Sequence, residues 1–195
     1  MDCHAKKPGW IARIKYAAGK MTPMGEARED IRRIALVGNP NVGKSVIFNS
    51  LTSAYVTVSN YPGTTVEVSR GICQGTGLRF EVVDTPGMYS MLPISDEERV
   101  TRNLLISERP DLIVHVVDAK NLGRMLPLTL QLMEAGFDVL LVLNMMDEAR
   151  ALGIKIDLHL LEDRLGIPVA GASAAINEGL GDIIVRIEEK LTHAA

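Results

Sequence analysis

From residue 31 onward the chain repeats one pattern, in which a short apolar run is followed by a turn and then by a segment with apolar residues at helical spacing. The short runs are rich in Val, Ile and Leu at consecutive positions, as are strands whose two faces are both covered. They predict strands over residues 33–38, 80–84, 112–118, 139–144 and 168–172. Alternating strands and helices predict an α/β fold, a three-layer sandwich in which helices cover both faces of a mostly parallel sheet.

The segments between these strands predict helices over residues 44–53, about 95–107, 124–135, 157–165 and 178–192. In the last helix, apolar residues recur every three or four positions from Leu180 to Leu191. Residues 66–84 depart from the alternation, because two extended runs are joined by a turn that contains Gly75 and Gly77. This pattern predicts a hairpin, and hence a sheet of about six strands of which one is antiparallel.

Residues 1–30 differ from the rest of the chain. They are basic at first, are broken by proline and glycine, and contain no long apolar run, so we expect an N-terminal extension ahead of a domain over residues 31–195. Within the extension, WIARIKYAAGK (residues 10–20) places Trp10, Ile11 and Ile14 on one helical face. This stretch is typical of a short helix on the domain surface, and a membrane-surface or partner-binding helix is the alternative.

Composition narrows the classes of function. The 195 residues, 47% of them hydrophobic, are enough for one full core. A formal net charge of -3 gives no broad positive surface, so no nucleic-acid partner is expected. Cys3 and Cys73 lie far apart in a chain without a secretory signal pattern, which fits a reducing, cytoplasmic compartment. The apolar runs are much shorter than the ~20 residues that a membrane-spanning helix requires.

Residues 38–45 read GNPNVGKS, a full match to the phosphate-binding motif G-x-x-x-x-G-K-[ST], between a predicted strand and a predicted helix. Glycines without a Cβ let the backbone curl around a phosphate and point N–H groups at it, at the positive end of a helix dipole. Lys44 adds a mobile charge for the β and γ phosphates, and Ser45 adds a hydroxyl for Mg²⁺. The nucleotide-binding residues expected here are Gly38, Asn39, Asn41, Val42, Gly43, Lys44, Ser45 and Val46.

The sequence FEVVDTPG places Asp84 at the end of another predicted strand, where a carboxylate is needed beside the metal. The spacing D-x-x-G puts Gly87 where its backbone N–H can meet the γ-phosphate. An Asp before a Pro-Gly turn is common, so this signal is informative only together with the phosphate-binding motif. We expect Ser45 and Asp84 to hold Mg²⁺.

The sequence VLLVLNMMD ends a further strand with Asn144 and Asp147 in an N-x-x-D arrangement. A carboxylate can accept hydrogen bonds from both N1–H and the 2-amino group of guanine, whereas adenine offers no such pair, so Asp147 predicts a guanine nucleotide. Met145 stands where a lysine is often found, which makes base stacking apolar there. Ser173 and Ala174, near the next strand end, are candidates for contact with the base edge.

These four motifs, in this order, are similar to those of Ras-like P-loop GTPases. Within that superfamily GNPNVGKSVIFNSLT, NYPGTTVE, DTPGMYSM, PDLIVHVVDAKNLGR and LNMMDEA together resemble the cytosolic G domain of bacterial ferrous iron transport protein B (FeoB). The resemblance covers about residues 32–192. It implies a Mg²⁺-dependent GTPase that binds GTP and GDP and hydrolyses GTP slowly by itself.

The resemblance also implies roles that the motifs alone do not give. Residues 58–67 would form the first switch loop, in which Thr65 matches the threonine that reaches Mg²⁺ in the GTP state, with Thr64 as the alternative. Met88 stands where Ras carries the glutamine that orients the attacking water, and a thioether cannot do so. Asn41 matches an asparagine that helps to hold K⁺ beside the phosphates in potassium-activated relatives. The catalytic residues would then be Lys44, Asn41, Thr65 and Gly87.

The leading hypothesis is a GTPase switch that serves ferrous iron uptake at the inner face of the cell membrane. Its partners would be a membrane-embedded iron transporter domain, in the same chain or another, and other small proteins of the transport system. The alternatives are a regulatory module that holds the nucleotide without hydrolysing it unaided, and a GTPase of ribosome or tRNA maintenance, against which the acidic balance counts. Members of this family continue from the G domain into a helical domain and a membrane domain. The chain is therefore expected to be either a fragment of such a protein or a free-standing relative.

Overall fold

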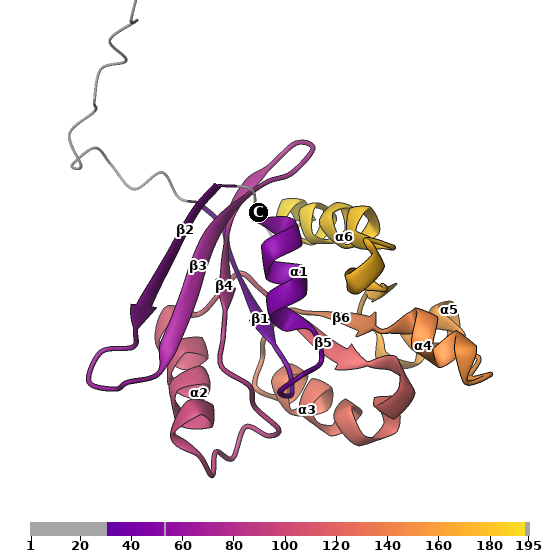
Figure 1. Ribbon diagram of the computed structural model, residues 1–195, viewed down its shortest axis with the longest axis horizontal. Coiled ribbons are helices and arrows are strands. Elements are labelled where there is room, and N and C mark those ends of the chain that lie inside the picture. Colours follow the sequence, from indigo (N-terminus) through magenta and orange to yellow (C-terminus); the bar gives the residue numbers. More distant parts are fainter. Residues whose placement is uncertain (1–30, 53, 194–195) are drawn as a thin grey trace, which may run out of the picture.

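A computed structural model describes residues 31–52 and 54–193, so the expected N-terminal extension and its helix over residues 10–20 lie outside the described residues. One sheet of seven strands runs through the domain in the order β2-β3-β4-β1-β5-β6-β7 (Figure 1). The strands are β1 (Arg33–Val37), β2 (Ala54–Asn60), β3 (Glu67–Gln74), β4 (Arg79–Asp84), β5 (Leu112–Asp118), β6 (Val139–Asn144) and β7 (Val169–Gly171). The helices are α1 (Lys44–Leu51), α2 (Asp96–Glu108), α3 (Leu122–Glu134), α4 (Met146–Ala151), α5 (Leu158–Leu165) and α6 (Leu180–His193), with short 3-10 turns η1 (Ala119–Asn121) and η2 (Ala174–Ile176).

The topology confirms the α/β fold and the antiparallel strand. Strands β4, β1, β5, β6 and β7 are parallel, whereas β3 is antiparallel to both of its neighbours. The β3–β4 hairpin is the one that the turn with Gly75 and Gly77 predicts. Strand β2 is additional: it begins directly after the helix expected over residues 44–53, and it overlaps the start of the first switch loop expected over residues 58–67. As an edge strand it leaves Val56 and Val58 about half exposed, so it lacks the continuous apolarity of a covered strand.

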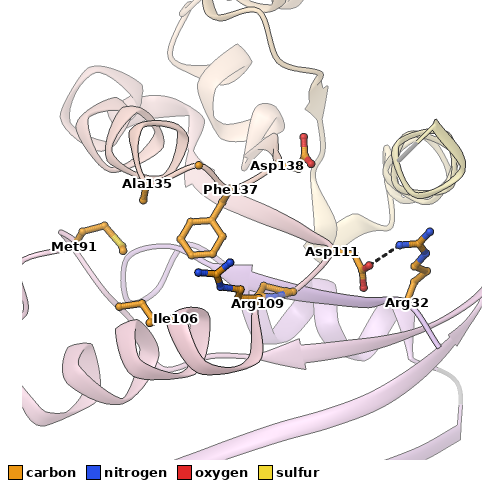
Figure 2. Close-up of a pocket in the computed structure, with 10 residues that line it drawn as sticks. Arg32, Met91, Ile106, Arg109, Asp111, Ala135, Phe137 and Asp138 are labelled. Atoms are coloured by element: carbon orange, nitrogen blue, oxygen red, sulfur yellow. Dashed lines mark hydrogen bonds and ion pairs between the residues drawn. The ribbon is translucent and has the colours of Figure 1, made fainter. Parts of the chain in front are cut away.

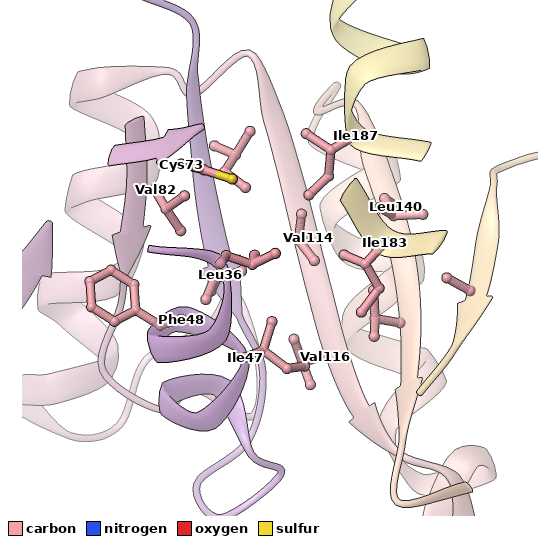
Figure 3. Packing of buried hydrophobic residues seen from close by; sticks show 14 of the residues in the cluster. Leu36, Ile47, Phe48, Cys73, Val82, Val114, Val116, Leu140, Ile183 and Ile187 are labelled. Carbon is pink, nitrogen blue, oxygen red and sulfur yellow. The ribbon is translucent and has the colours of Figure 1, made fainter. Parts of the chain in front are cut away.

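Helices cover both faces of the sheet, because each face presents its own apolar layer. On one face Ile47 and Phe48 of α1 and Ile183 and Ile187 of α6 pack on strand residues such as Val114 (Figure 3). On the other face, α2 and α3 pack with Leu104, Leu105, Leu128 and Leu132. Among the helices that the structure describes, none combines the length and the apolarity needed to cross a bilayer.

His115 is the buried titratable group at the centre of β5. Its side chain is fully buried, and Nδ1 lies 2.9 Å from the hydroxyl of Thr129, while Nε2 has no hydrogen-bond partner among the described residues. Burial, helped by the charge of Lys44, lowers the pKa of His115 to about 3. The imidazole is therefore neutral in the folded chain at neutral pH.

We expect His115 to make the domain sensitive to mild acid. Below about pH 6.5 the unfolded chain binds a proton that the folded chain rejects, so stability falls by about 1.4 kcal/mol per pH unit as the pH drops toward 3. Urea unfolding should show that the wild type loses about 2 kcal/mol more between pH 7 and pH 5 than His115→Gln does. The exposed His159→Gln is the control, and equal losses in all three proteins would contradict this assignment.

Candidate functional site

The predicted motifs meet at one edge of the sheet, because the carboxyl ends of parallel strands lie together. Residues 38–43 follow β1, Asp84 ends β4, Asp118 ends β5 and Asn144 ends β6. The strand register places Asp118 opposite Asn144 and Leu36 opposite Asp84. Open parallel sheets bind ligands at this edge.

The loop over residues 38–43 requires glycine at both of its ends. A Cβ on Gly38 would lie 2.1 Å from the carbonyl oxygen of Val116, and a Cβ on Gly43 would lie 2.3 Å from Nδ2 of Asn144. Gly43 also has a φ of 90°, a left-handed conformation that side chains disfavour. The loop is therefore a narrow backbone cradle that ends at the N-terminus of α1.

Lys44 is the cation inside this cradle. Its ammonium donates hydrogen bonds to the carbonyl oxygens of Gly38 and Asn39, both at 3.1 Å, and the residue is 8% exposed. Burial lowers the pKa of Lys44, and the carboxylate of Asp84 partly opposes that shift. The ammonium is thus held by neutral acceptors in a place where an anionic oxygen would bind more strongly.

Ser45 and Asp84 form a pair of oxygen ligands beside the cradle. The Ser45 hydroxyl donates to Oδ2 of Asp84 at 2.8 Å, while Oδ1 is buried without a hydrogen-bond partner among the described residues. Burial raises the pKa of Asp84, against the opposing effects of Ser45 and Lys44. A hydroxyl and a carboxylate with an unsatisfied oxygen suit a hard cation such as Mg²⁺, so these residues fit the predicted metal.

The segment after Asp84 is tied to the phosphate loop through its backbone. The N–H of Met88 donates to the carbonyl oxygen of Gly38 at 3.1 Å, and a Cβ on Gly87 would lie 2.7 Å from Cγ of Pro40. Glycine is therefore required where the two segments touch. Met88 is fully buried among apolar side chains, so it packs in the core and does not face the loop.

Asn144 links three segments at the other end of the site. Its amide group donates to the carbonyl oxygen of Val42 at 2.9 Å and accepts from the N–H of Ala174 at 3.0 Å. The N–H of Asp147 donates to the hydroxyl of Ser173 at 3.0 Å. These bonds bring the predicted base-site residues together, with Met145 in a left-handed conformation (φ 61°) at the start of α4.

The Asp147 carboxylate remains available at this end of the site. The residue is half-buried, and its carboxylate makes no hydrogen bond to another residue of the described segments. A half-buried carboxylate of this kind can accept two parallel hydrogen bonds from the donors of a planar ligand.

Thr64 and Thr65 lie in the loop between β2 and β3, at the same edge of the sheet but beside α2. Both are exposed, and the Thr64 hydroxyl donates to the carbonyl oxygen of Tyr61 at 2.9 Å. The loop lines a cavity together with Asp96 and Arg99 of α2. Within the described chain, no hydrogen bond joins Thr65 to Ser45 or Asp84, so its contact with a metal stays a prediction. Asn41 and Val46 are exposed at the rim of the cradle.

The residues that follow β5, beside the predicted base site, were missed by the sequence reasoning. Asp118 ends β5, accepts from the backbone N–H of Lys120 at 2.9 Å and accepts from Asn121 at 2.8 Å. The Lys120 ammonium also forms an ion pair with Glu148 of α4, next to Asp147. An Asp that ends a fully apolar strand, as Asp84 does, was the available signal for Asp118.

Comparisons with known proteins identify relatives of the described domain. A family model described as ferrous iron transport protein B matches residues 32–187. An Fe(2+) transport protein A/Fe(2+) transporter FeoB fusion protein of Porphyromonas gingivalis is 44% identical over 152 residues, which are 77% of this chain and 18% of that protein. The Fe(2+) transporter FeoB of Synechocystis is 38% identical over 154 residues, which are 78% of this chain and 25% of that protein. This chain thus spans a quarter or less of the length of these curated relatives.

Solved structures give the same picture. The FeoB G-domain from Methanococcus jannaschii has a TM-score of 0.72 and 45% identity, and the match covers 83% of this chain and 97% of that one. The cytosolic domain of the T. maritima FeoB iron transporter in its GMPPNP form has a TM-score of 0.76 and 37% identity, over 84% of this chain and 63% of that one. A variant of S. thermophilus NFeoB bound to GDP has a TM-score of 0.76 and 44% identity, over 84% and 61%.

Proposed function

Because the chain belongs to the family of ferrous iron transport protein B, of which it matches the G domain, we propose that it binds GTP and GDP with Mg²⁺ and hydrolyses GTP to GDP and phosphate. The observation that carries this proposal is the position of Lys44. A buried ammonium, held only by neutral carbonyl oxygens inside a ring of backbone, needs an anion to be fully satisfied. A phosphate chain supplies that anion.

The phosphate-binding part of the proposal rests on the cradle and on the oxygen pair beside it. Backbone N–H groups of the loop and the N-terminus of α1 would receive the β-phosphate, and Lys44 would bridge the β and γ phosphates. Ser45 and Asp84 would hold Mg²⁺, and the backbone of Gly87 would contact the γ-phosphate. The set proposed to bind the phosphates and the metal is Gly38, Asn39, Asn41, Val42, Gly43, Lys44, Ser45, Val46, Thr64, Thr65, Asp84 and Gly87.

The base-binding part rests on the links that Asn144 makes. By fixing the phosphate loop to the loop after β7, Asn144 would hold both walls of the base site at a constant separation. Asp147 would accept from N1–H and the 2-amino group of guanine, with Met145, Ser173 and Ala174 around the base. Relatives with 36% and 44% identity have been solved in complex with GDP, which supports a guanine nucleotide here.

The proposed hydrolysis is slow by itself and is accelerated by K⁺. Met88 is buried and has no group that can orient water, so charge neutralisation must come from elsewhere. Asn41 lies at the rim of the cradle, where its amide oxygen can face a monovalent cation beside the phosphates. Thr65 would complete the metal shell once its loop moves toward Ser45, a change typical of switch segments.

We expect GTP turnover to be faster in KCl than in NaCl, and the difference to disappear in Asn41→Gly. Glycine removes the amide but keeps the left-handed backbone of Asn41 (φ 64°) without strain, which alanine would not do. Steady-state phosphate release in the two salts measures the effect, with the exposed Asn49→Gly of α1 as the control. Equal rates in both salts would remove the cation from the mechanism, and full stimulation in Asn41→Gly would remove Asn41 from it.

The proposed biological role is a nucleotide-controlled switch for ferrous iron transport at the cytoplasmic side of the cell membrane. The named relatives are Fe(2+) transporters, and the segment that they share with this chain is their G domain. The partner would be a membrane-embedded transporter domain, in the same chain or another, together with small proteins of the same transport system.

Isothermal calorimetry with GTP, GDP and ATP in the presence of Mg²⁺ tests the proposed function. We expect both guanine nucleotides to bind and ATP to bind much more weakly, because adenine gives the Asp147 carboxylate no pair of donors. Binding of none of the three would reject the nucleotide site. Tight ATP binding would keep the phosphate cradle but reject the base assignment.

A further inference from the structure

Residues 87–95, between β4 and α2, stand where a Ras-like GTPase would have its second switch, and they are called the second switch segment below. Large apolar side chains are exposed in this segment. Tyr89 is 62% exposed, Leu92 is 77% exposed and Ile94 is 89% exposed. They line a cavity of about 620 Å³ together with Pro40 of the phosphate loop. Clustered exposed apolar side chains of this kind mark interaction surfaces.

Glu98 of α2 holds this surface in place. Its carboxylate accepts from the backbone N–H groups of Tyr89, at 3.0 Å, and Ile94, at 2.7 Å, and the Ser95 hydroxyl caps the helix. Because the backbone is bound to α2 at Tyr89 and at Ile94, the segment that carries these two exposed side chains and that of Leu92 is held against the helix. The surface is therefore preorganised for a partner.

The charge beside this surface is negative. Asp96 and Glu97, in the first turn of α2, are both exposed. Asp96 has one exposed ion pair, to Arg99, and Glu97 has none among the described residues. An apolar surface with an acidic rim suits an occupant that is apolar on one side and basic on the other.

The chain itself contains such an occupant. Residues 10–20 carry Trp10, Ile11 and Ile14 on one side of a helical pattern and three basic residues elsewhere, and they lie outside the described residues. We propose that residues 10–20 dock on the second switch segment, with their apolar side on Leu92 and Ile94 and their basic residues toward Asp96 and Glu97. Docked there, they would restrain the segment that contacts the phosphate loop.

The connection is long enough for this contact. Arg32, where the chain enters the domain, and Met91 of the second switch segment line one cavity of about 470 Å³ (Figure 2). Figure 2 shows Arg32 and Met91 on opposite sides of Arg109 and Phe137 in that cavity. The eleven residues between position 20 and Arg32 can span roughly 36–40 Å when extended. Arg32 lies just before β1, and the second switch segment lies toward the edge of the sheet at which β1 ends. The connection is about twice as long as the five-residue strand β1 that separates these two levels.

Trp10 is the single tryptophan of the chain, so its fluorescence reports directly on its surroundings. We expect the emission of the full chain to lie at a shorter wavelength than that of free tryptophan and to be protected from acrylamide. Replacing Leu92 and Ile94 together by Ser should shift the emission to longer wavelength, since each change lowers the equilibrium constant for docking by about tenfold. Leu152→Ser with Leu160→Ser removes two other exposed apolar side chains, 67% and 52% exposed, and should leave the emission unchanged.

A second variant tests the charge. Glu97→Lys should weaken docking, and added salt should weaken it in the wild type but less in the variant. Four results would overturn the proposal: emission like that of free tryptophan in the full chain, an unaltered spectrum in the double Ser variant, a shift that depends on protein concentration, or a shift that requires anionic lipid vesicles. The last two would assign residues 10–20 to a second copy or to a membrane. None of these measurements needs a nucleotide, so their outcome is separable from that of the proposed function.

Discussion

Asp147→Asn is expected to lower affinity for GDP by about 2–5 kcal/mol, roughly 30- to 5,000-fold, and to favour xanthosine diphosphate instead. The reason is the direction of hydrogen bonding. Guanine presents two donors, N1–H and the 2-amino group, and an amide offers only one acceptor to them and directs its own N–H at the amino group. Xanthine has a carbonyl oxygen in place of that amino group, so the amide pairs with it in full.

The fold predicts that this exchange leaves the framework of the site intact. Asp147 contacts Ser173 through its backbone N–H at 3.0 Å, and that bond does not depend on the side chain. Asn144 continues to join the phosphate loop to the loop after β7. Calorimetry with both diphosphates measures the change, with Asp163→Asn on the exposed side of α5 as the control. Unchanged preference for guanine would remove Asp147 from the base site.

The strands that the sequence predicted best share one physical property: both of their faces are covered by other parts of the chain. Strands β1, β5 and β6 are buried along almost their whole length, so consecutive apolar residues identify them without knowledge of their neighbours. Strand β2 lies at the edge of the sheet, and its exposed Val56 and Val58 break that rule. The short helix α4 was missed because six residues contain too little periodicity to be recognised.

The residues of the candidate site also fall into those that the sequence could assign and those that it could not. Residues within one motif, such as Gly38, Gly43 and Lys44, could be assigned because spacing along the chain fixes their relation in space. The role of Asn144 could be assigned only in part, since Val42 lies 102 positions from it in the chain and its hydrogen bond depends on tertiary packing. The position of Thr65 was beyond the sequence for a similar reason: its loop lies beside α2 through contacts that no local pattern encodes.

Lys44→Ala is expected to weaken nucleotide binding by about 30- to 5,000-fold while leaving the domain folded. In the wild type the ammonium is buried and bonded only to the carbonyl oxygens of Gly38 and Asn39. Burial lowers its pKa, which means that folding disfavours the charged form. Removing this charge therefore relieves a cost, and we expect the free energy of unfolding to change by less than about 1 kcal/mol.

Nucleotide affinity should fall strongly in the same variant, because the buried ammonium would interact favourably with the oxygens of a phosphate chain. An ammonium with anionic oxygens in a water-poor cradle forms charge-assisted hydrogen bonds about twice as strong as those to neutral carbonyls. Losing one partner of such a pair costs about 2–5 kcal/mol, on the order of 30- to 5,000-fold in affinity. Urea unfolding and calorimetry on the same preparation separate the two effects, with Lys155→Ala in an exposed loop as the control. A folded Lys44→Ala protein that binds GTP as tightly as the wild type would show that the cradle does not hold phosphate, because no other buried cation in the described segments faces it.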